Sequence, residues 1–65
     1  MRVYINNQPF ELPPGATLAD AVTTFQAAAP FAAAVNMQFV PQSQYASTVL
    51  KTNDAIEIIR PVTGG

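Results

Sequence analysis

Hydrophobic and polar residues alternate near both ends of the chain, at residues 2–6 and 55–62. Alternation of β-forming residues is typical of half-buried strands. The inward positions of the two segments are Val3, Ile5, Ile56 and Ile58. Glu57 and Ile59 then point outward. Because both segments are rich in apolar residues, we predict two strands that lie side by side, parallel, in the middle of one sheet.

Two asparagine-led turns follow strand-like segments, since Asn tolerates the positive φ that tight turns require. Asn6-Asn7 joins the first strand to a second apolar stretch at residues 9–12. Asn36-Met37 joins a small apolar segment at 32–36 to a short strand at 39–40, which Pro41 ends. These patterns predict two β-hairpins.

One amphipathic helix is predicted between the two hairpins. Thr17 occupies the N-cap position, and Asp20 lies near the positive end of the helix dipole. The apolar residues at helical spacing are Leu18, Ala21, Val22 and Phe25. We expect the helix to end at about Ala28, because Pro30 disfavours helical geometry in the residue before it.

The remaining segment, residues 42–54, predicts a helical turn around residues 43–45 and a turn at 51–54. The order of elements is therefore β-β-α-β-β-β. This order predicts an α+β fold of the β-grasp (ubiquitin-like) class, with a mixed sheet of four to five strands and one main helix packed across it. We expect a single domain over residues 1–65, with a flexible tail at 63–65.

Composition narrows the classes of partner. The 65 residues carry a net charge of −1, and only 11% are charged. The three cations, Arg2, Lys51 and Arg60, are too few and too scattered for the basic footprint of a nucleic-acid binder. The longest apolar run is nine residues, too short to span a bilayer, and no signal-peptide pattern follows Met1. We expect a cytoplasmic protein with no nucleic-acid or membrane partner.

The sequence offers few residues that could catalyse a reaction. The sequence has no Cys and no His, which removes the usual general base and the commonest metal ligands. Ser43 and Ser47 have no evident base to activate them. We therefore expect no catalytic residue, no metal and no bound cofactor, and a chain on which other enzymes act.

The ending PVTGG offers a different chemical group. By composition alone, two consecutive glycines at given positions occur in about one chain in 200. Without Cβ atoms, Gly64 and Gly65 can pass through a narrow channel, and the terminal carbonyl stays open to a nucleophile. A frayed chain end is the alternative interpretation.

The chain resembles the sulfur-carrier family of thiamine biosynthesis, the ThiS family, over residues 1–65. The segments that carry the resemblance are the Asn6-Asn7 turn, Gly15-Ala16-Thr17-Leu18, Val35-Asn36, Val40-Pro41, the Asp54-x-Ile-x-Ile stretch and Gly64-Gly65. The chain departs from the family at Thr52-Asn53-Asp54, where an Asp-Gly pair is common. We expect Asn53 to supply the positive φ there.

The resemblance implies a carrier function with three partners. An E1-like adenylating enzyme (ThiF-like) would use ATP to convert the Gly65 carboxylate into an acyl-adenylate, with Gly64 threading the tail into its site. A sulfur-donating persulfide protein would supply the sulfur of a thiocarboxylate. Thiazole synthase (ThiG-like) would take that sulfur.

Two other interpretations remain open. The chain could carry sulfur for another pathway, as the molybdopterin synthase small subunit or a cysteine-type carrier does. It could also be a ubiquitin-like interaction module without tail chemistry.

A partner surface is predicted from the strand alternation. Tyr4 and Ile59 point outward from adjacent central strands, and Phe39 is a further candidate. Arg60 is either an electrostatic tether or a solvated strand end. Isolated apolar surface residues are the ordinary alternative to a contact patch.

Overall fold

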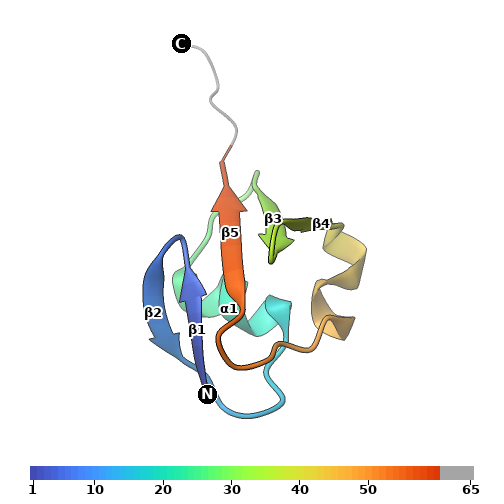
Figure 1. Cartoon of the computed structure of the whole chain (residues 1–65). Coiled ribbons are helices and arrows are strands. Elements are labelled where there is room, and N and C mark those ends of the chain that lie inside the picture. The colour runs from blue at the N-terminus through green and yellow to red at the C-terminus, as the bar shows by residue number, and fades with distance from the viewer. Residues whose placement is uncertain (61–65) are drawn as a thin grey trace.

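Five strands and one main helix make up the described part of the chain, residues 1–60 of a computed structural model (Figure 1). The elements in chain order are β1 (Arg2–Ile5), β2 (Gln8–Glu11), α1 (Leu18–Phe25), β3 (Ala32–Val35), β4 (Gln38–Val40), the 3₁₀-helix η1 (Gln42–Ser47) and β5 (Ala55–Ile59). This confirms the predicted order β-β-α-β-β-β, with η1 at the place of the predicted helical turn.

The strands form one mixed sheet in the order β2-β1-β5-β3-β4. β1 and β5 run parallel, with Tyr4 opposite Ala55 and Ile5 opposite Ile56, and every other pairing is antiparallel. Both end strands of the chain are therefore central in the sheet, as predicted. Figure 1 shows that β5 separates the two hairpins and that α1 crosses behind the sheet.

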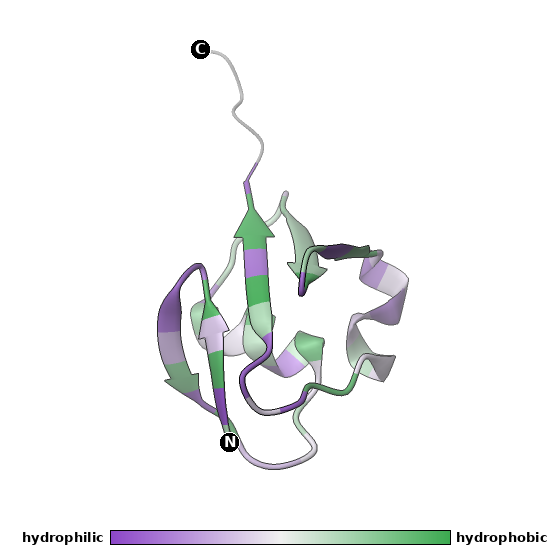
Figure 2. Cartoon of the chain, in the orientation of Figure 1, coloured by the Kyte–Doolittle hydropathy of each residue, from purple (hydrophilic) through white to green (hydrophobic). Residues whose placement is uncertain are grey.

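The core lies between the inner face of the sheet, α1 and η1. The buried residues are Val3, Ile5, Leu12, Ala16, Leu18, Ala21, Ala33, Val40, Tyr45, Leu50, Ile56 and Ile58. Two aromatic pairs border them, Phe10 edge-to-face on Phe25 and Phe31 stacked on Tyr45, with centroids 5.8 and 6.0 Å apart. Figure 2 shows β5 largely hydrophobic and β2 largely hydrophilic, as expected for a central and an edge strand. Within residues 1–60, no helix is long and apolar enough to cross a membrane.

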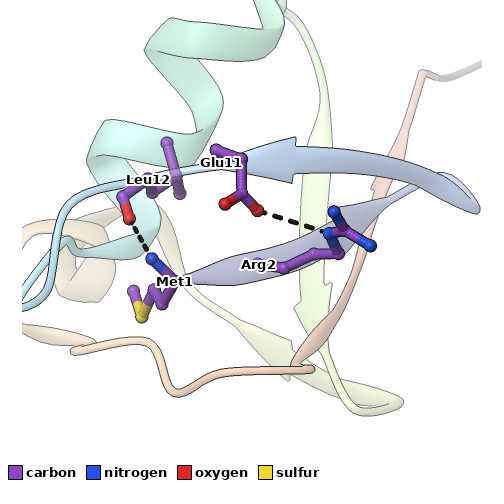
Figure 3. Close-up of polar contacts among 4 residues, drawn as sticks. All are labelled: Met1, Arg2, Glu11 and Leu12. Carbon is purple, nitrogen blue, oxygen red and sulfur yellow. Dashed lines mark hydrogen bonds and ion pairs between the residues drawn. The ribbon is translucent and has the colours of Figure 1, made fainter.

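The base of the first hairpin is closed by polar contacts (Figure 3). The Met1 ammonium group donates to the Leu12 carbonyl at 2.7 Å, and Arg2 Nε lies 3.3 Å from Glu11 Oε2. The hydrogen bond to Glu11, with a smaller effect of Tyr4, raises the pKa of the Arg2 guanidinium above its ordinary value. Both side chains of this ion pair are exposed, so it contributes little to stability.

The helix begins as predicted and ends early. Thr17 and Asp20 form a reciprocal capping box, in which each side chain accepts a hydrogen bond from the other residue's backbone N–H. The expected end at Ala28 is wrong, because Gln26 adopts a left-handed conformation with φ 60° and its N–H bonds back to the Thr23 carbonyl. A left-handed C-terminal residue ends a helix without glycine when its backbone bonds are satisfied.

The other boundaries hold with small shifts. β2 starts one residue before the predicted stretch, and β3 ends one residue before Asn36. β5 ends at Ile59 and not at residue 62, so that Arg60 follows the strand. Residues 61 and 62, like the predicted tail at 63–65, lie outside the described residues. Asn53 takes a φ of 69°, which confirms its expected role in the turn before β5.

Both hairpin turns have two central residues with positive φ. The values are 51° and 67° for Asn6 and Asn7, and 50° and 69° for Asn36 and Met37. This pair of conformations matches the type I′ turn, which fits the twist of antiparallel strands and favours Asn followed by Gly. Met37 is therefore an unfavourable residue at its position, and its side chain is 87% exposed.

We predict that Met37→Gly stabilises the protein by about 1 kcal/mol, because it relieves the left-handed strain of a side chain that contributes little packing. The measurement is the free energy of unfolding in urea. Gln38→Gly, in the adjoining strand β4, is the control and should destabilise the protein. A loss of stability in Met37→Gly would show that the Met37 side chain makes a stabilising contact.

Candidate functional site

The candidate site is the carboxyl end of β5, the strand that leads to the predicted reactive glycines. Gly64 and Gly65 lie outside the described residues, so their predicted roles in threading and covalent modification are not tested by the structure. The described residues establish how the strand before them is held. β5 lies between β1, which pairs with Ala55 and Ile56, and β3, which pairs with residues 56–59, and asparagine side chains supply the hydrogen bonds that these strands leave out.

Asn6 extends the pairing of β1 beyond its last residue. The Asn6 Oδ1 atom accepts a hydrogen bond from the Ile58 N–H at 2.9 Å, and Nδ2 donates to the Ile58 carbonyl at 3.2 Å. A side-chain amide has one acceptor and two donors, so it can replace a strand neighbour for one residue. The amide of Asn6 therefore holds β5 one residue before its end.

Asn36 makes the matching contact at the start of β5. Its backbone N–H donates to the Ala55 carbonyl at 2.7 Å, and its Oδ1 atom accepts from the Ala55 N–H at 3.0 Å. Its Nδ2 atom donates to Asp54 Oδ1, while Asp54 Oδ2 accepts from the Lys51 N–H. The two asparagines were predicted as turn residues only. Their side-chain role depends on strand register, which the alternation pattern does not reveal.

The edges of the sheet are poor surfaces for adding a strand. The edge strand β2 contains Pro9, which has no N–H to donate. The other edge, β4, is three residues long and is followed by Pro41. Short edges that carry proline resist pairing with another chain. A partner is better accommodated on the outer face, opposite α1.

Two large apolar side chains are exposed on this outer face. Phe39 is 68% exposed and Ile59 is 56% exposed. Phe39 pairs with Ala34 of β3, and Ile59 pairs with Ala32 of the same strand. Because the alanine side chains are small, the surface between Phe39 and Ile59 forms a shallow depression. We call these four residues the outer apolar patch.

Tyr4 lies away from this patch. It shares the outer face, but it pairs with Ala55, four residues before Ile59 on β5. At about 3.3 Å per residue, the offset along the strands is roughly 13 Å. Tyr4 is also half-buried. The structure thus brings Phe39 and Ile59 onto the two sides of β3 and places Tyr4 at the other end of β5.

Two charged residues border the outer face near the end of β5. Arg60 follows the strand and is exposed. Glu57, an outward position of β5, lies directly opposite Ala34 of the patch and is also exposed. Within residues 1–60 the ion pair formed is Arg2–Glu11, so neither Arg60 nor Glu57 is paired there.

Two open hollows on the surface of residues 1–60 lie beside β5. The larger, of about 380 Å³, includes Lys51 and Asp54 in its lining and lies at the start of β5, away from the end that leads to the glycines. Asp54 is occupied there by its hydrogen bonds to Asn36 and Lys51. The smaller, of about 290 Å³, lies beside Tyr4 and Glu57. Within residues 1–60, no group of three or more metal-binding side chains comes together.

Comparisons with known proteins identify a family and a shared fold. The sequence model of the ThiS family matches residues 3–65. The crystal structure of the thiamine biosynthesis protein ThiS from Geobacter metallireducens is similar over 100% of both chains, with a TM-score of 0.83 and 17% identity. A solution structure of a thiamine biosynthesis protein from the same organism has a TM-score of 0.79 and 17% identity, covering 100% of this chain and 88% of the other. The comparison with curated proteins found no match.

We predict that Asn6→Gly destabilises the protein by about 1–3 kcal/mol, because it removes two hydrogen bonds to Ile58 and retains the positive φ. Asn7→Gly is the matched control, since Asn7 makes no side-chain hydrogen bond within residues 1–60. Urea unfolding of both variants measures the difference. Equal stability of the two variants would mean that the Asn6 amide contributes nothing to holding β5.

Proposed function

The chain belongs to the ThiS family of thiamine-biosynthesis sulfur carriers, and from this premise we propose that Gly65 carries the sulfur as a C-terminal thiocarboxylate. The observation that carries the proposal is that the family match continues through residue 65 and so includes both glycines. The chain is then a substrate of its partner enzymes and not itself an enzyme, and its reactions belong to the cytoplasm.

The proposed chemistry has two stages. In the first, the Gly65 carboxylate attacks the α-phosphate of ATP in an E1-like adenylating enzyme (ThiF-like), and pyrophosphate leaves. In the second, the terminal sulfur of a persulfide protein attacks the activated carbonyl, and AMP leaves. A thiol then attacks the donor-protein sulfur of the resulting acyl disulfide, which forms a new disulfide on the donor protein and releases the thiocarboxylate. Thiazole synthase (ThiG-like) accepts this sulfur.

The composition of the chain supports a carrier that holds sulfur at its C-terminus while partner enzymes perform the chemistry. The sequence contains no cysteine, so sulfur cannot be held on a thiol side chain of the carrier. ATP is bound by the activating enzyme, and no cofactor is proposed for the carrier itself. Gly64 has no Cβ and can therefore pass through a narrow entrance, while Gly65 leaves the reacting carbonyl unhindered.

We propose that the outer apolar patch docks on the activating enzyme. Its exposed side chains, Phe39 and Ile59, lie on the face opposite α1, and Ile59 is the last residue of β5. A surface at the base of the tail can hold the carrier while the glycines enter the active site. Arg60, which follows Ile59, is placed to add an electrostatic contact at the rim.

We predict that intact-protein mass will increase by the difference between one sulfur and one oxygen. The reaction contains the chain, ATP, an E1-like adenylating enzyme from the same organism and a persulfide sulfur source. Deletion of Gly65 should abolish the gain, because Gly64 then presents its carboxylate one residue short of the reactive position. If the full chain gains no mass and forms no adenylate, the proposed function is wrong, and a ubiquitin-like interaction module becomes the better interpretation.

We also predict that Ile59→Asp raises the KM of the adenylating enzyme for the carrier by at least tenfold, because it places a charge in an apolar contact. Thr24→Asp is the control, since it adds a charge of the same sign on the exposed surface of α1, on the other side of the sheet from the patch. Both variants should unfold at a urea concentration close to that of the unsubstituted chain. Unchanged kinetics for Ile59→Asp would remove the patch from the docking surface.

A further inference from the structure

The smaller hollow of about 290 Å³ lies on the outer face between β1 and β5. Its lining residues are Tyr4, Asn6, Asn7, Ala55, Ile56 and Glu57. Strand alternation directs the side chains of Tyr4, Ala55 and Glu57 toward this face, opposite the buried Ile5 and Ile56. Ala55 has only a methyl group, so space remains between the aromatic ring and the carboxylate.

The charge of the hollow is negative. Glu57 is the one ionised side chain in its lining, and it forms no ion pair within residues 1–60. Arg2 is the cation that precedes Tyr4 on the same face of β1; its guanidinium lies 3.3 Å from Glu11 and also interacts with the Tyr4 side chain, but it makes no ion pair with Glu57. A cation that enters the hollow therefore meets an available carboxylate and an aromatic ring.

The size of the hollow limits what it can receive. Sites for small molecules and cofactors usually have volumes of about 300–1,000 Å³ and bury most of the ligand. This hollow lies just below that range and is open, which suits one long side chain of a protein. A guanidinium group fits the lining better than an ammonium group, because it is planar and can stack on a ring while it binds a carboxylate.

We propose that this hollow receives an arginine side chain of the protein that docks on the outer face, with the guanidinium between the Tyr4 ring and the Glu57 carboxylate. The inference rests on the proposed function to the extent that this protein is the adenylating enzyme. Glu57 and Ile59 lie on the same face of β5, two residues or about 7 Å apart, so one partner surface covers both.

The arginine contact complements the outer apolar patch. Apolar side chains such as Phe39 and Ile59 contribute affinity without strong directional preference, whereas a charge pair fixes the orientation of a partner. A second fixed point along β5 prevents the carrier from rotating on the patch. The tail is then aimed at one position on the enzyme. Glu57 is accordingly a residue that determines which partner the chain accepts.

The first test uses a small probe and needs no partner. The ¹⁵N-labelled chain is titrated with N-acetyl-arginine N-methylamide, and with the citrulline analogue as an uncharged probe of the same shape. We expect saturable shifts of the Tyr4, Asn6, Ala55 and Glu57 amides, with a dissociation constant of about 10 mM. Glu57→Gln should abolish these shifts, and Glu11→Gln should retain them. Equal shifts with citrulline, equal shifts around Glu11, or no saturation would overturn the inference.

The second test uses the adenylating enzyme. Glu57→Gln should raise its KM for the carrier about tenfold and leave kcat unchanged. Thr24→Lys is the control, because it changes the net charge by the same amount on the exposed surface of α1. A KM within twofold of the original for Glu57→Gln would rule out an arginine contact in this complex. If the unsubstituted chain is not adenylated at all, the proposed function fails, and the titration alone decides whether the hollow binds arginine.

Discussion

The structure depends on the burial of β5 between two strands that come from opposite ends of the chain. Neither neighbour covers β5 over its full length, so both ends of the strand need other hydrogen-bond partners. Asn6 and Asn36 supply them from hairpin turns, where their positive φ directs the side chains back toward β5. Each asparagine therefore both forms a turn through its backbone and extends the pairing of the sheet through its side chain. The position of the last strand, and with it the direction in which the chain leaves the domain, follows from these contacts.

In this arrangement the inner face of the sheet forms the core, and the outer face is exposed. Every inward side chain of β5 is buried against the core, while its outward side chains are exposed. Proline on or beside the edge strands makes those edges unsuitable for strand addition, whereas the outer face exposes Phe39 and Ile59. Along β5, this face changes from an acidic hollow near Ala55 and Glu57 to an apolar surface at Ile59. The two ends of this face therefore differ in chemical character.

Much of the fold could be predicted because alternation and turn chemistry are local properties. The inward positions Ile56 and Ile58, the asparagine turns and the capping box at Thr17 all depend on neighbours within a few residues. The end of the helix was missed, because Gln26 takes a left-handed conformation that its residue type does not favour. The separation of Tyr4 from Ile59 and the hollow beside Glu57 could not be predicted either. Both depend on the register of β1 against β5, which sequence alternation leaves undetermined.

The pairing of the first strand with the last also has a consequence during synthesis of the protein. The core strand β1 is translated before its neighbour β5, and residues 6–54 lie between the two strands. Contacts between such distant segments form slowly, because the entropy cost of closing a long loop comes before the contacts can stabilise the chain. A chain that terminates prematurely lacks the central strand and leaves the two hairpins without a common neighbour. Only a chain translated through β5 can therefore complete the middle of the sheet and its outer face.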